Sequence, residues 1–132
     1  MATREQLAGW LENEQASTII MMREKTPEGF RNRWGRISRE PRTFGEEYLG
    51  MFEGKLGVLS YAIALLEAGA AVYELVELFA RKYVSDHKGF EQTKREVQKQ
   101  GNSDSDLDQF IIEKLRGAAE TVQQVLTEAT RD

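Results

Sequence analysis

The sequence predicts an all-α fold, a compact bundle of four to five helices with one long central helix at about residues 44–84. Apolar residues recur at three- and four-residue spacings along most of the chain, as they do on one face of a helix. Short alternations of apolar and polar residues do not persist, so no strand is expected. A chain of 132 residues with 40% hydrophobic and 30% charged residues fits one soluble domain, residues 1–132.

The first two predicted helices are marked by their start signals. Residues 3–6, Thr-Arg-Glu-Gln, have the form of a capping box and open a helix that runs to about Lys25. Thr26-Pro27 places a hydroxyl at the N-cap and a proline at the first helical position, which predicts a short helix over about 27–37. This helix carries one apolar stripe: Phe30, Trp34 and Ile37.

The predicted central helix follows Pro41 and a second capping-box sequence at residues 43–46. Two apolar ridges with seven-residue spacing run along it: Leu59, Leu66, Tyr73 and Ala80, and Val58, Leu65, Val72 and Phe79. A mainly charged set with the same spacing lies opposite them: Glu53, Ser60, Glu67, Glu74 and Arg81. Two ridges exceed what one antiparallel neighbour needs, so a homo-oligomer is a further expectation.

Three glycines near the start of this helix need an explanation, because each costs about 1 kcal/mol relative to alanine inside a helix. They are Gly50, Gly54 and Gly57. Either another helix approaches closely there, or the helix kinks, or it begins later than residue 44.

The residue pattern in the last third of the chain predicts two more helices. Residues 85–100 are polar, with Phe90 and Val97 as anchors, and predict a weakly buried helix that stops at Gly101-Asn102. Ser105, followed by acids that favour the N-terminal end of the helix dipole, opens the last helix. Its buried stripe is Leu107, Ile111, Leu115, Ala118, Val122, Val125 and Ala129.

Composition excludes several classes of protein. The chain has no cysteine, which excludes disulfides and thiolate zinc sites. The most apolar run, residues 56–80, is interrupted by Glu67, Glu74 and Glu77, which are costly in lipid, so no membrane association is expected. The first residues lack the apolar core of a signal peptide, and we expect a cytoplasmic location.

No arrangement of residues predicts catalysis. His87 is the only histidine, and its position at an inferred helix start predicts an exposed side chain rather than a member of a triad. Glu46-Glu47 followed by Glu74-x-x-Glu77 resembles, in part, the acid motifs of all-α nucleotide pyrophosphatases, a resemblance that would imply a metal-dependent nucleotide hydrolase. Gly50 stands where that family has a third acid, and Glu77 stands where it has aspartate. We therefore expect a non-enzymatic protein.

Metal and cofactor motifs are incomplete as well. Five residues fall at EF-hand offsets 1, 3, 5, 7 and 12: Asn102, Asp104, Asp106, Asp108 and Glu113. Leu107 occupies the offset at which a calcium loop needs glycine, and helix capping explains the same acids. No glycine-rich loop precedes a lysine and a hydroxyl residue, as a phosphate-binding loop requires. We expect no metal and no cofactor.

The strongest functional signal is a run of arginines in an otherwise acidic chain. Residues 23–43 hold seven bases and three acids, a net charge of +4 in a chain of net −4, which leaves −8 on the remainder. No lysine occurs between residues 31 and 42. The planar guanidinium fork matches phosphate or carboxylate at two points, so an all-arginine run suggests geometric recognition of an anion. The candidate binding residues are Arg31, Arg33, Arg36, Arg39, Arg42 and Trp34.

Three interpretations of these arginines stay open. They could pair with the glutamates of the long helix, bind a nucleic-acid backbone, RNA or DNA, or meet an acidic protein surface. The first hypothesis is a non-enzymatic helical subunit of a larger, possibly nucleoprotein, assembly that contacts phosphates without reading sequence. The alternative is a protein–protein adaptor or inhibitor, such as phages encode against host machinery, acting through acidic helix faces. Those faces are Glu67, Glu74 and Glu77, or residues 104–108.

Overall fold

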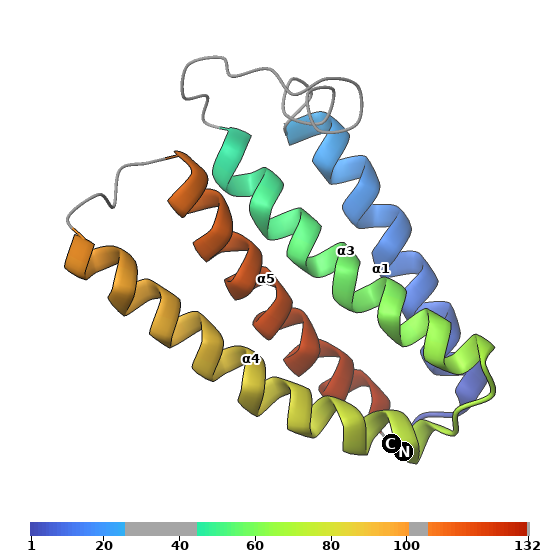
Figure 1. Ribbon diagram of the computed structural model, residues 1–132. Helices are drawn as coiled ribbons and strands as arrows, with labels where there is room; N and C mark the ends of the chain where they lie inside the picture. Colours follow the sequence, from blue (N-terminus) through green and yellow to red (C-terminus); the bar gives the residue numbers. More distant parts are fainter. Residues whose placement is uncertain (26–44, 101–105, 132) are drawn as a thin grey trace.

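The computed structural model shows an all-α protein, as the sequence predicts (Figure 1). The residues that the structure describes are 1–25, 45–100 and 106–131. Four α-helices and no strand occur in these ranges: α1 (Arg4–Lys25), α3 (Gly45–Glu67), α4 (Val72–Gln100) and α5 (Asp106–Ala129). The short helix predicted over 27–37 and the stop predicted at 101–102 lie outside the described residues.

The helices lie side by side in the order α1, α3, α5, α4 (Figure 1). The central pair, α3 and α5, runs parallel, and α1 and α4 flank it in the opposite direction. The chain termini meet at one end of the bundle, where the Ala2 N–H donates to the Ala129 carbonyl at 2.9 Å.

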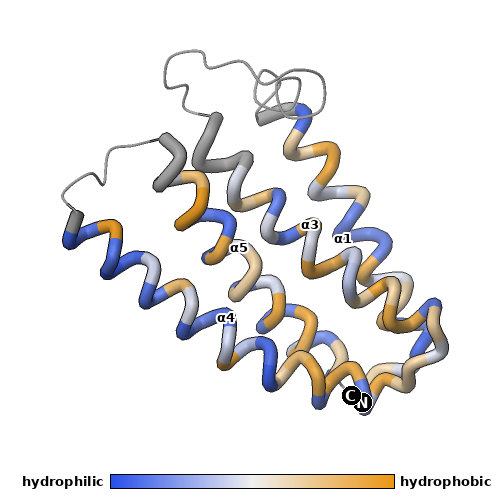
Figure 2. Tube along the Cα trace, in the orientation of Figure 1, coloured by the Kyte–Doolittle hydropathy of each residue, from blue (hydrophilic) through white to orange (hydrophobic). Residues whose placement is uncertain are grey.

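The main core lies at the end of the bundle where the termini meet. All four helices contribute to it, and its buried residues are Leu7, Leu11, Val58, Leu59, Ala62, Leu66, Val72, Leu75, Phe79, Val122, Val125 and Ala129. Towards the other end, two smaller clusters replace it: Met22, Phe52 and Phe110, and Phe90, Val97 and Ile112. The largest cluster of buried residues therefore lies near the termini. Figure 2 shows that the second half of α4 is mainly hydrophilic.

Both apolar ridges predicted from residue 58 to residue 66 are used inside the chain. Val58, Leu59 and Leu66 are buried in the main core, and Leu65 packs against it. Since α1 and α5 cover these ridges, α3 by itself gives no reason for self-association, which stays a prediction.

Glycine lets the backbones of α3 and α5 touch. A Cβ on Gly50 would lie 2.5 Å from the Phe110 carbonyl oxygen, and one on Gly54 would lie 2.1 Å from that of Lys114. From the other side, a Cβ on Gly117 would lie 2.4 Å from the Met51 carbonyl oxygen. The first of the three explanations for the glycines is thus confirmed at Gly50 and Gly54: another helix approaches closely.

The prediction of a single helix over about 44–84 is wrong, because α3 ends at Glu67 and α4 begins at Val72. Gly69 adopts a φ of 98°, a left-handed conformation that glycine reaches without steric cost. Its N–H donates to the Leu66 carbonyl, and the Ala70 N–H donates to the Leu65 carbonyl, both at 3.0 Å. These two bonds form a Schellman motif that closes α3. Across this turn only one of the two predicted ridges stays buried: Val72 and Phe79 lie in the same core as the end of α3, whereas Tyr73 and Ala80 are exposed.

Local polar contacts tie the helix ends together. The capping box predicted at residues 3–6 is confirmed: the Gln6 N–H donates to Thr3 Oγ1 at 3.1 Å, and the Thr3 N–H donates to Gln6 Oε1 at 2.9 Å. The Arg4 guanidinium donates to the Leu66 carbonyl, which places a cation at the C-terminal end of α3. Glu74 accepts the Ala71 N–H at 3.1 Å and so caps the start of α4.

The second half of α4 corresponds to the weakly buried helix predicted over residues 85–100. Phe90 and Val97 are buried, as expected of its anchors. This stretch continues from Val72 without a break, so the inferred helix start at His87 is wrong. His87 is exposed, and it lies in the middle of a 29-residue helix.

We expect Gly54→Ala to lower the free energy of unfolding by about 1–3 kcal/mol, because the new methyl group overlaps backbone atoms of α5. Gly57→Ala is the matched control on the same helix. A Cβ at Gly57 would meet no atom within 4 Å beyond its neighbours in its own helix, so this substitution should raise stability by up to about 1 kcal/mol. Urea unfolding measures both, and equal effects of the two substitutions would contradict the close contact.

A second pair of variants tests the turn between α3 and α4. Gly69→Ala should destabilise the protein by about 1–2 kcal/mol, because an L-residue is strained at this positive φ. Gly89→Ala, within α4 and with open space at its Cβ, should be neutral or stabilising. Thermal unfolding followed by circular dichroism measures both, and a neutral Gly69→Ala would be inconsistent with the observed turn.

Candidate anion-binding groove between α4 and α5

All six candidate binding residues of the sequence lie within residues 26–44, outside the described residues, so their role stays a prediction: Arg31, Arg33, Trp34, Arg36, Arg39 and Arg42. The structure does place the two ends of this segment. Lys25 ends α1 and Gly45 begins α3, both at the end of the bundle opposite the chain termini (Figure 1).

The described part of the chain contains a second cationic region, on α4. Residues 81–99 hold six bases and three acids, a net charge of +3. Arg81, Lys88 and Arg95 are exposed, and they share one side of the helix because they are seven residues apart. Among the described residues, none of these three forms an ion pair. Lys82 does: it lies 3.1 Å from the buried Oδ2 of Asp86.

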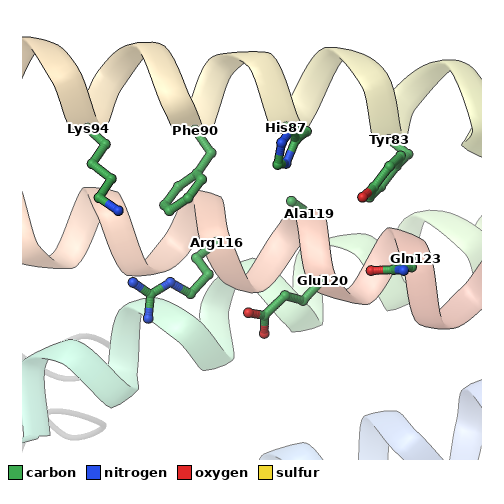
Figure 3. A pocket seen from close by; sticks show the side chains of 8 residues that line it. All are labelled: Tyr83, His87, Phe90, Lys94, Arg116, Ala119, Glu120 and Gln123. Carbon is green, nitrogen blue, oxygen red and sulfur yellow. The ribbon is translucent and has the colours of Figure 1, made fainter.

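A groove lies beside this cationic region, between α4 and α5 (Figure 3). Its volume is about 260 Å³. The side chains from α4 point towards α5, with Lys94 and Arg116 at one end and Tyr83 and Gln123 at the other. Its lining residues are Tyr83, His87, Phe90 and Lys94 from α4, and Arg116, Ala119, Glu120 and Gln123 from α5.

Both cations of the groove, Lys94 and Arg116, contact the aromatic ring of Phe90. The Lys94 ammonium lies 5.9 Å from the centroid of the Phe90 ring, and the Arg116 guanidinium carbon lies 5.8 Å from it. Such cation–π contacts are worth about 0.5–1 kcal/mol at exposed sites. Arg116 also pairs with Glu113 at 3.2 Å, which uses one of its nitrogens and leaves other N–H donors. Two cations from different helices are thereby held near each other.

The middle and far end of the groove are aromatic and polar. The rings of Tyr83 and His87 stack with centroids 5.9 Å apart and an interplanar angle of 21°. Glu120 and Gln123 are exposed on α5, one turn apart. Glu120 has no ion-pair partner in the part of the chain that the structure describes. The groove is thus cationic at one end, holds the Glu120 carboxylate in its middle, and is uncharged at the end formed by Tyr83 and Gln123.

The acids considered for metal binding do not come together. No group of three or more histidine, aspartate or glutamate side chains that could hold a metal occurs among the described residues. Glu47 lies in the first turn of α3 and Glu74 in that of α4, at opposite ends of the bundle, so the pyrophosphatase-like acids do not share a site. Helix α5 begins at Asp106, so the later offsets of the proposed calcium loop are helical.

No helix within the described ranges has the length and apolar character needed to span a membrane. No family model, curated protein or solved structure matches the chain.

Sequence reasoning missed the groove because its two sides are about thirty residues apart and each looks ordinary alone. The α4 side was predicted only as part of a polar, weakly buried helix over residues 85–100. The signal that could have found it is the group of aromatic and basic residues at helical spacing on α4: Tyr83, His87, Phe90 and Lys94.

We expect Lys94→Gln and Arg116→Gln to change the free energy of unfolding by less than about 1 kcal/mol each, since their cation–π contacts are at the surface. Phe90→Ala should cost about 3 kcal/mol or more, because the ring is only 9% exposed and packs with Val97 and Ile112. Urea unfolding of the three variants measures this difference. A large loss of stability in either cation variant would show that the cations are structural.

Proposed function

We propose that this protein is a non-catalytic binding protein, a small helical subunit of a larger assembly that holds the phosphate backbone of a nucleic acid. The arginine-rich segment, residues 31–42, supplies the principal contacts. The observation that carries this proposal is the net charge of +4 over residues 23–43 in a chain of net −4. Arginine forks bind phosphate oxygens at two points and position a backbone without reading its sequence.

The positions of three acidic side chains support an external partner. The sequence offered the glutamates of the long helix as internal partners of the arginines, and Glu67, Glu74 and Glu77 are three of these. They lie around the turn between α3 and α4, whereas Lys25 and Gly45 flank the arginine segment at the other end of the bundle. The length of α3, 23 residues, separates these ends by about 33 Å.

The exposed cations of α4 give further support. Arg81, Lys88 and Arg95 face solvent and have no ion pair within the described residues. A long polyanion held by the arginine segment could gain additional, non-specific contacts from such a row of charges.

A protein–protein adaptor or inhibitor remains the alternative, and one observation favours it. Glu67, Glu74 and Glu77 are all exposed at the α3–α4 turn, where they form an acidic surface without a paired cation in the part of the chain described. A basic protein surface would complement it.

Binding of fluorescent single-stranded RNA and DNA, measured by anisotropy over a range of salt concentrations, tests the proposal. If all five arginines contact phosphates, the logarithm of the binding constant should fall with that of the salt concentration with a slope of about −3.5. Replacing the five arginines by glutamine should remove most of the affinity and flatten the slope. A complex insensitive to salt, or one that the five substitutions leave intact, would disprove the proposal.

The matched control carries Glu67→Gln, Glu74→Gln and Glu77→Gln, which changes charge at the opposite end of the bundle. It should bind the strands as well as the unmodified protein, or more tightly, because three negative charges are removed. If neither RNA nor DNA binds the unmodified protein, the acidic surface becomes the better candidate for the functional interface.

A further inference from the structure

The side chains of the α4–α5 groove differ in character along its length (Figure 3). Lys94 and Arg116 form a cationic zone at one end, and Phe90 and His87 form an aromatic zone beside it. The Glu120 carboxylate lies opposite the aromatic zone, directed towards Arg116, and Gln123 lies at the far end. We infer that this groove binds one nucleotide, with the phosphate at the cationic zone and the base beside His87. This site goes beyond the backbone contacts proposed above and does not use the arginine segment.

The cationic zone suits a phosphate group. The Lys94 ammonium offers up to three donors, and Arg116 keeps N–H groups beyond the one directed at Glu113. Both cations rest on the Phe90 ring, which limits the side-chain freedom lost when an anion binds. The buried ring also keeps water from one side of the cations, which strengthens their attraction for phosphate.

The rest of the groove suits a base. The exposed His87 ring, stacked on Tyr83, offers an aromatic surface for a planar heterocycle. The Glu120 carboxylate accepts hydrogen bonds only, so it favours a base that carries amino and imino donors, as guanine does. The Gln123 amide both donates and accepts, and it can meet the remaining atoms of the base edge.

The length and volume of the groove limit the size of the ligand that it can hold. Lys94 and His87 are seven residues apart on α4, which separates them by about 10 Å along the helix axis. This separation is comparable with the distance from the phosphate of a nucleotide to its base. The volume of about 260 Å³ lies just below the range of about 300–1,000 Å³ for small-molecule pockets, so the groove has no room for two nucleotides.

A sugar phosphate alone, or a simple dicarboxylate, fits the groove less well. Either would use the cationic zone but would leave the aromatic zone and the Glu120 carboxylate without partners. The charge pattern also disfavours a purely anionic ligand, since Glu120 would repel it in the middle of the groove.

The only histidine of the chain lies in this groove and makes the test specific. We expect guanosine 5′-monophosphate, titrated into the full-length isotope-labelled protein, to shift the His87 imidazole NMR signals in a saturable way. Ribose 5-phosphate and guanosine, each lacking one half of the ligand, should bind at least about tenfold more weakly, since each loses one set of charged hydrogen bonds or stacking contacts.

Lys94→Gln combined with Arg116→Gln should weaken guanosine monophosphate binding by about tenfold or more. Lys114→Gln, which removes a cation from α5 outside the groove, is the matched control and should bind as the unmodified protein does. The amide spectrum of each variant, compared with that of the unmodified protein, verifies that the fold is retained.

Three results would overturn the inference: no shift at His87 up to millimolar nucleotide, unchanged binding in the double variant, or equal affinity for ribose 5-phosphate. The protein with all five arginines replaced by glutamine separates this site from the proposed function. It should lose strand binding and still bind guanosine monophosphate. Strand binding without any nucleotide response at His87 would leave the proposed function standing and remove the groove site.

Discussion

The close contact between the backbones of α3 and α5 determines the rest of the structure. Glycines at the crossing let two helix backbones touch where any side chain would collide with a carbonyl group. Parallel helices cannot be joined by a short loop, so the chain has to return along the whole bundle between them. Helix α4 makes this return over 29 residues, and it therefore packs antiparallel against α5. The position of the groove follows from this connection.

The groove exists because apolar burial diminishes along α4. Near Val72 the helix contributes to the shared core of all four helices, but farther on only Phe90 and Val97 are buried, against Ile112 of α5. Because so few buried residues join α4 to α5 in this region, the neighbouring side chains of α4 stay at the surface. Lys94 and His87 consequently stay accessible while Phe90 fixes the spacing between the two helices.

The sequence predicted the features that depend on neighbouring residues, and it missed those that depend on contacts between residues far apart in the chain. The capping box at residues 3–6 and the burial of Phe90 and Val97 follow from local chemistry and periodicity, and both are confirmed. The turn at Gly69 was missed because the seven-residue apolar pattern crosses it without interruption. The groove was missed because it forms only when residues 83–94 pack beside residues 116–123. The arginine segment was visible as charge, and it lies outside the residues that the structure describes.

The distribution of charge along the bundle orients the proposed partner. The exposed acids Glu67, Glu74 and Glu77 gather at the α3–α4 turn, and the arginine segment begins and ends at the opposite end, about 33 Å away. A polyanion is repelled by the first end and attracted to the second, so it approaches the protein in one orientation. Screening at physiological salt acts over about 8 Å, so the two ends influence the partner separately. The α4–α5 groove lies between them, where the attraction of the arginine segment is screened and short-range contacts with Lys94, Arg116 and His87 decide what binds.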